Sequence, residues 1–248
     1  EAEPRLCVDA LLPFYNGQPD WEGFEKSLRW MAACAEADGI DLRFVLNADT
    51  GYVFNLSTDL YTEVLRRFRG IFPEATFIAG CTAVDASPEV FDADRYRPHL
   101  DVAQAHGPCE VMLMTSQALN ALGPERRRDA YYTIAESITV PALVHALEPA
   151  FVPWATPFEP WLLHQLAQHP KFTGGKISTL DEPHFLYWAA MTKDIGLDFA
   201  PHSGDDFGIA SAIKMGLPLL IGAGVSACPL ICTAKKLWCK PHYDARVY

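Results

Sequence analysis

Residues 172–179 read Phe-Thr-Gly-Gly-Lys-Ile-Ser-Thr, a short run with β-branched residues and two glycines before a single lysine. This pattern predicts a buried strand that ends at the mouth of a cavity. A lysine on an interior strand is unusual, because removing an ammonium group from water costs free energy. Burial lowers the pKa of an amine, and only a neutral amine attacks a carbonyl carbon to form a Schiff base. Two interpretations of Lys176 follow: it is a nucleophile, or it ends its strand in solvent or in an ion pair.

The same pattern of strand and helix repeats along the chain. Strand-like apolar runs are expected at residues 7–14, 42–47, 76–80, 110–115, 141–147, 172–179, 198–201 and 218–221. Helical patterns are expected at about 24–37, 58–69, 93–105, 124–137, 158–168, 182–193 and 229–238. Eight repeats of about 30 residues with apolar, non-alternating strands are typical of an α/β protein with a closed (β/α)8 TIM barrel. We therefore predict one TIM-barrel domain over residues 1–248.

Composition and motifs exclude several other classes of protein. A doubly wound open sheet is the alternative fold, but the nucleotide-binding motifs Gly-x-Gly-x-x-Gly after the first strand and Gly-x-x-x-x-Gly-Lys-Ser/Thr are absent from the sequence. The net charge of −11 argues against a nucleic-acid or anionic-membrane partner. No apolar run is long enough to predict a membrane span. The odd number of cysteines, 7, without Cys-x-x-Cys spacing predicts no disulfide framework and favours a reducing, cytoplasmic compartment.

If the barrel closes, the loops after its strands meet at one face, where barrel enzymes carry their active sites. The backbone N–H groups of Thr50 and Gly51 are expected to form a small nest for a carboxylate. An imine at Lys176 needs a nearby acid or base, and His145 is a candidate because histidine titrates near neutral pH; the alternative is a neutral, hydrogen-bonded core histidine. The polar residues expected at this face are Asp49, Thr50, Thr115, Ser116, His145, Lys176, Ser203, Gly204, Asp205, Asp206 and Ser226.

Several of these segments resemble the dihydrodipicolinate synthase and N-acetylneuraminate lyase (DHDPS/NAL) family of class I, Schiff-base-forming aldolases. Residues 174–178, Gly-Gly-Lys-Ile-Ser, resemble the segment around the family's imine lysine. Asp49-Thr50-Gly51 resembles its carboxylate-binding loop, and residues 203–206 match its Ser-Gly-Asp-Asp motif. Ile221, with Ser226 and Pro229 beyond it, keeps the spacing of a later family segment. The resemblance implies a TIM barrel that lacks most of the family's C-terminal helical extension.

The resemblance also implies roles for individual residues. Lys176 is expected to form a Schiff base with pyruvate or a related 2-oxo acid, and His145 or a water molecule to move the proton. Thr50 is expected both to take part in catalysis and to seat the substrate. The family pattern implies no cofactor and no metal, a small-molecule substrate, and a homo-oligomer that is a dimer or a tetramer. The substrate-binding positions that it implies are Asp49, Thr50, Gly204, Asp206 and Ile221.

The chain also departs from the family pattern. His145 stands where the family has its acid/base tyrosine, and Asp49 replaces a threonine. An anionic Asp49 would repel a substrate carboxylate unless its side chain turns away. These departures argue against dihydrodipicolinate synthase itself and leave open a family member that binds a 2-oxo acid or a sugar acid without turnover. A metal-dependent aldolase is a third possibility, with its ligands drawn from His145, His202, Asp49 and Asp206.

Overall fold

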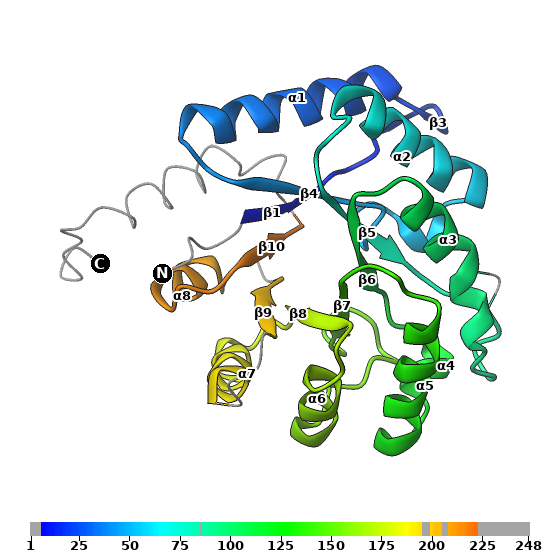
Figure 1. Ribbon diagram of the computed structural model, residues 1–248, viewed down its shortest axis with the longest axis vertical. Helices are drawn as coiled ribbons and strands as arrows, with labels where there is room; N and C mark the ends of the chain where they lie inside the picture. The colour runs from blue at the N-terminus through cyan, green and yellow to red at the C-terminus, as the bar shows by residue number, and fades with distance from the viewer. Residues whose placement is uncertain (1–5, 85, 195–198, 205–207, 223–248) are drawn as a thin grey trace.

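The computed structural model describes residues 6–84, 86–194, 199–204 and 208–222, and its centre is a closed barrel of parallel strands (Figure 1). The strands follow one another around the barrel in the order β1, β10, β9, β8, β7, β6, β5 and β4. The predicted TIM barrel is therefore confirmed. The barrel strands are β1 (Leu6–Asp9), β4 (Leu42–Leu46), β5 (Phe77–Cys81), β6 (Cys109–Leu113), β7 (Ala142–Leu147), β8 (Phe172–Ser178), β9 (Ala200–Ser203) and β10 (Leu219–Ile221).

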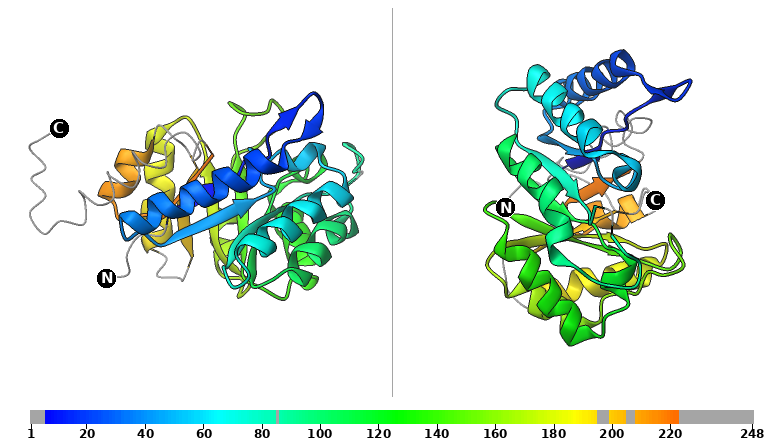
Figure 2. Two further views of the ribbon diagram at one scale, coloured as in Figure 1. Left: turned by 90° about the horizontal axis from the view of Figure 1, so that it is seen from above. Right: turned by 90° about the vertical axis from the view of Figure 1, so that its right-hand side faces the viewer.

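Helices surround the strands on the outside of the barrel (Figures 1 and 2). None of the helices within the described ranges has the length and apolarity that crossing a bilayer requires. The helices are α1 (Trp21–Ala37), α2 (Thr58–Ile71), α3 (Arg97–Ala105), α4 (Gln117–Asn120), α5 (Pro124–Glu136), α6 (Pro160–Ala167), α7 (Glu182–Asp194) and α8 (Ile209–Lys214), with 3-10 turns η1 (Val53–Asn55) and η2 (Ala93–Tyr96).

The first and last units differ from the expected pattern. Strand β1 ends at Asp9 instead of continuing to residue 14, and a small hairpin of β2 (Phe14–Tyr15) and β3 (Gln18–Pro19) follows it (Figure 2). The short helix α8 was not expected from the sequence. The helix predicted at 229–238 lies outside the described residues. The early end of β1 matters for function, because it puts a carboxyl group at the end of a barrel strand.

Helices α1 and α2 show how local sequence signals build the outer layer. Asp20 caps α1 by accepting a hydrogen bond from the Gly23 N–H at 2.9 Å, and Ser57 caps α2 through the Leu60 N–H at 3.2 Å. The residues that α1 buries recur every three or four positions, which gives one apolar face towards the barrel. They are Phe24, Leu28, Met31 and Ala35.

The loop after β4 is held close to the end of β5. Asn47 has a φ of 52°, a left-handed conformation that asparagine tolerates better than most residues, and its side-chain amide donates to the Tyr61 carbonyl at 3.1 Å. Gly80 on β5 lets this loop approach, because a Cβ at that position would lie 2.7 Å from Ala48 Cα. The tight crossing directs the next two residues, Asp49 and Thr50, over the mouth of the barrel.

Replacing Gly80 with alanine is expected to destabilise the protein, because the clash is with backbone that cannot move aside. Gly80→Ala should lower the free energy of unfolding by about 1–3 kcal/mol or more, measured by urea denaturation. The matched control is Gly70→Ala in α2, where an added Cβ meets no atom within 4 Å. That change should leave stability unchanged or raise it by up to about 1 kcal/mol. Equal effects of the two substitutions would contradict the proposed close approach.

Candidate active site

Three neighbouring strands place ionisable side chains at one level of the barrel. His145 on β7 is in register with Lys176 on β8, which is in register with His202 on β9. All three residues are buried, with exposed fractions of 0%, 1% and 4%. The loop after β4 contributes Asp49 and Thr50 from across the barrel. The strand order thus brings together groups that are far apart in the sequence.

Lys176 forms an ion pair with Asp49. The distance between Lys176 Nζ and Asp49 Oδ1 is 2.8 Å, and the lysine side chain is 1% exposed whereas the aspartate is 24% exposed. Burial raises the pKa of Asp49, but the positive charge of Lys176, with further contributions from His145 and from the hydrogen bond with Lys176, outweighs it and holds that pKa below its ordinary value. Lys176 is therefore both buried and paired, as the second interpretation of the sequence had it. Its role as a nucleophile stays a prediction.

Asp9, at the end of β1, is a member of the site that the sequence analysis missed. It is fully buried and accepts a hydrogen bond from the Thr50 hydroxyl through Oδ2, while its Oδ1 has no hydrogen-bond donor among the described residues. Burial raises the pKa of Asp9 to about 8, against the opposing effect of Lys176 and with a further contribution from the negative charge of Asp49. Asp9 is therefore protonated at neutral pH. An aspartate within the apolar run at residues 7–14 was the available signal.

His145 is a neutral histidine inside the barrel. Its Nε2 lies 3.0 Å from the Ser178 hydroxyl, and its Nδ1 is buried with no hydrogen-bond partner in the described part of the chain. Burial lowers the pKa of His145 to about 4, and the charge of Lys176 adds to this while Asp49 opposes it. The histidine thus enters any reaction at neutral pH as an uncharged group. Whether it moves a proton stays a prediction.

Gly204 and Gly222 stand where a side chain would collide with Lys176 or Thr50. A Cβ on Gly204 would lie 2.8 Å from both Cγ and Cε of Lys176, and a Cβ on Gly222 would lie 2.8 Å from Thr50 Cγ2. Gly204 therefore packs directly against the lysine side chain. Ile221, at the end of β10, is fully buried in the core. Asp206 lies outside the described residues, as do Asp205 and Ser226.

The loop at Thr50 and Gly51 has backbone donors to offer. Neither N–H group donates to a backbone carbonyl within the ranges that the structure describes. The Asp49 side chain turns towards Lys176, so that its negative charge faces a positive one. The adjacent N–H groups of Thr50 and Gly51 are suited to an anionic ligand, because the negative charge of Asp49 beside them is balanced by Lys176.

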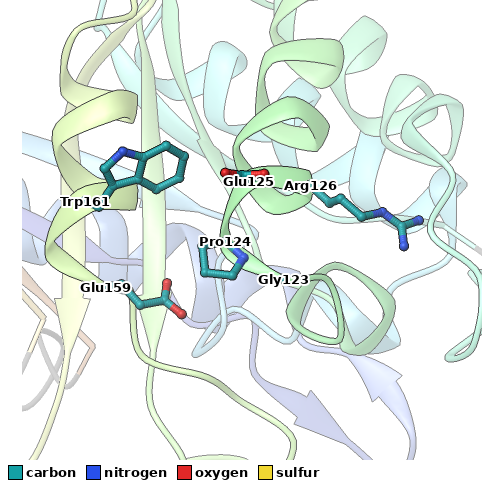
Figure 3. A pocket seen from close by; sticks show the side chains of 6 residues that line it. All are labelled: Gly123, Pro124, Glu125, Arg126, Glu159 and Trp161. Carbon is teal, nitrogen blue, oxygen red and sulfur yellow. The ribbon is translucent and has the colours of Figure 1, made fainter.

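A separate cavity lies outside this cluster, at the beginning of helices α5 and α6 (Figure 3). It has a volume of about 650 Å³, and none of the residues expected at the active site lines it. Its lining residues are Gly123, Pro124, Glu125, Arg126, Glu159 and Trp161.

The metal-dependent alternative finds no support in the described residues. They contain no group of three or more histidine, cysteine, aspartate or glutamate side chains placed to hold a metal ion. His202, one of the suggested ligands, has its Nδ1 3.0 Å from the Ala200 carbonyl oxygen.

Comparison with known proteins places the fold. The chain matches no protein-family model and no curated protein. Among solved structures, it resembles dihydrodipicolinate synthase from Acinetobacter baumannii, described as chloride inhibited and complexed with pyruvate, with a TM-score of 0.78 and 19% identity over 95% of this chain and 75% of that one. The enzyme from Bacteroides thetaiotaomicron gives a TM-score of 0.79 at 15% identity, covering 95% and 74%.

A third similar structure is described as the first monomeric dihydrodipicolinate synthase variant. It gives a TM-score of 0.77 at 18% identity and covers 92% of this chain and 72% of that one. At such low identities the likeness establishes the architecture and not the chemistry. The chain therefore has the TIM-barrel fold of the dihydrodipicolinate synthases, reached with a strongly divergent sequence.

Proposed function

We propose that this protein is a class I aldolase or lyase in which Lys176 forms a Schiff base with pyruvate or a related 2-oxo acid. The observation that carries the proposal is a lysine buried inside the barrel, with its Nζ 2.8 Å from the carboxylate of Asp49. A buried lysine is costly and is kept where its amine has a chemical task. The fold shared with dihydrodipicolinate synthases supports the same reaction class.

The substrate carboxylate is proposed to bind at the loop after β4. The N–H groups of Thr50 and Gly51 are the donors, and the pairing of Asp49 with Lys176 removes the repulsion that an unpaired Asp49 would exert. Ile221, Gly204 and Asp206 remain proposed contacts on the basis of the family resemblance. Carbon–carbon bond cleavage or formation, or dehydration, then takes place on the carbon next to the iminium.

His145 is the proposed carrier of the proton at that carbon, alone or through a water molecule. As a neutral imidazole it has one nitrogen able to accept a proton. Its Nε2 contact with Ser178 leaves Nδ1 as the nitrogen without a partner among the described residues. A buried base of this kind is effective because no bulk water competes for the proton.

The alternative is a protein that binds a 2-oxo acid or a sugar acid without turnover. It is favoured by the ion pair at Lys176, which stabilises the ammonium form, and by the histidine that stands where the family has a tyrosine. The homo-oligomeric state, the single domain over residues 1–248 and the cytoplasmic location also stay predictions from the sequence.

Reductive trapping tests the proposed Schiff base. Incubation with pyruvate and borohydride should add the mass of one reduced adduct to the intact protein, and peptide mapping should place it on Lys176. Lys176→Arg should abolish the adduct. Lys171→Arg is the matched control, since Lys171 Nζ binds the Ala135 carbonyl at 2.8 Å and the adduct should persist. An unmodified Lys176 under conditions that trap a known class I aldolase would refute the proposal.

Proton exchange separates the two candidate functions. His145→Gln retains an amide able to reach Ser178 and should still form the imine, but exchange of the pyruvate methyl protons in D2O, followed by NMR, should slow by roughly 10²–10⁴-fold. Wild-type rates in the variant would remove His145 as the proton carrier. A wild-type protein that traps pyruvate without exchanging its methyl protons would instead support binding without turnover.

A further inference from the structure

Two carboxyl groups and one amine occupy the same cluster at the end of the barrel. Asp49 contacts Lys176 Nζ, and Asp9 is connected to the same loop through the Thr50 hydroxyl. Strands β4 and β10, which pair with β1 on either side of Asp9, bring no further net charge to the cluster. The β10 residues 219–221 are apolar, and Arg43 on β4 is paired with Glu110 on β6. His145 on β7 is neutral. Within the described part of the chain, the cluster thus has one positive charge, on Lys176, and two carboxyl groups that can each be negative.

Charge balance decides the protonation of this cluster. A second carboxylate in this site, which has one cation, would be an uncompensated charge, and such a charge is strongly destabilising away from water. One carboxyl therefore keeps its proton, and the two residues titrate as a pair. Asp49, next to the ammonium group, is the ionised member, and burial together with the negative charge of Asp49 raises the pKa of Asp9 to about 8. When the pKa values of two neighbouring carboxyl groups are pushed apart in this way, the ionised group can accept a proton and the other group stays protonated.

We propose, resting on the Schiff-base function above, that Asp49 is a further catalytic residue that carries protons between the Lys176 nitrogen and the substrate oxygen. Asp9 is the positioning residue that keeps Asp49 and Thr50 in place and limits the cluster to one negative charge. The contact of 2.8 Å between Asp49 and the reacting nitrogen is within the reach that direct proton transfer requires.

Imine formation needs no proton from outside this cluster. Asp49 takes one proton from the ammonium group, and the resulting amine attacks the carbonyl carbon while the π pair of the C=O bond moves to oxygen. A second nitrogen proton passes to that oxygen and gives a carbinolamine. Asp49 then gives its proton to the hydroxyl, the C–O bond breaks, and the nitrogen lone pair forms the C=N bond. Of the three ammonium protons, one stays on the iminium and two leave in water.

The neutral state of Asp9 is a condition of this relay. If Asp9 ionises, a second negative charge acts on Lys176 and stabilises the ammonium form, so that removing its proton becomes harder. Imine formation should therefore slow as the pH rises past the pKa of Asp9. An ordinary lysine behaves in the opposite way, because its neutral fraction grows throughout this range.

The test is the rate of trapping with pyruvate and cyanoborohydride between about pH 6 and about pH 10, read by intact mass. The wild-type rate should fall on the alkaline side with a midpoint near pH 8. Asp9→Asn is neutral at every pH, so the pH profile of this variant should no longer show the alkaline fall. Asp49→Asn should reduce the rate by roughly 10²–10⁴-fold at every pH. The control Asp101→Asn, at an exposed position on α3, should match the wild type.

Separate results would overturn each part. A wild-type rate that only rises with pH, or an alkaline fall that persists in Asp9→Asn, removes the role of Asp9. An Asp49→Asn variant with the wild-type rate removes the role of Asp49. If no wild-type adduct forms at any pH, the Schiff-base function and the role of Asp49 both fail.

Carbon NMR of labelled aspartate tests Asp9 without substrate. A signal that titrates near pH 8 and is lost in Asp9→Asn supports a protonated Asp9 at neutral pH. The absence of such a signal overturns that protonation state.

Discussion

The ion pair between Lys176 and Asp49 is the interaction on which the site depends. It joins β8 to the loop after β4, which lie on different sides of the barrel and are separated by 127 residues. A buried ammonium group without this partner would be strongly destabilising. Other features of the site serve this contact: Gly204 makes room for the lysine side chain, and Gly80 lets the loop that carries Asp49 come close. The pair thus connects the fold with the proposed chemistry.

The charge state of the cluster follows from this pair. One ammonium group balances one carboxylate, so Asp9 keeps its proton, and burial keeps His145 neutral. In the proposed mechanism, Asp49 is the base that takes the proton of Lys176, so the amine does not depend on burial alone to become neutral. The resemblance to Schiff-base aldolases assigned the acid/base work to the position of His145. The structure adds the carboxylate of Asp49, whose Oδ1 lies 2.8 Å from Lys176 Nζ.

Much of the architecture was predictable, because eight apolar strands, seven of them followed by a helical pattern, leave few other folds. Lys176 also stood out locally, as a charged residue in an interior strand. Its partner did not, since a contact across 127 residues depends on how the barrel closes and on which way a loop turns. Asp9 was missed for a related reason: the apolar run at 7–14 reads as one long strand, whereas the structure ends β1 at Asp9 and has a small hairpin after it. Asp206 lies outside the described residues, so its predicted role stays a prediction.

A crystal structure of the protein soaked in pyruvate is the most direct measurement of the central claim. We expect continuous density from Lys176 Nζ to the carbonyl carbon of pyruvate, the pyruvate carboxylate at the N–H groups of Thr50 and Gly51, and Asp49 beside the new C=N bond. Pyruvate bound elsewhere, or Lys176 still paired with Asp49 and unmodified at saturating pyruvate, would contradict the account.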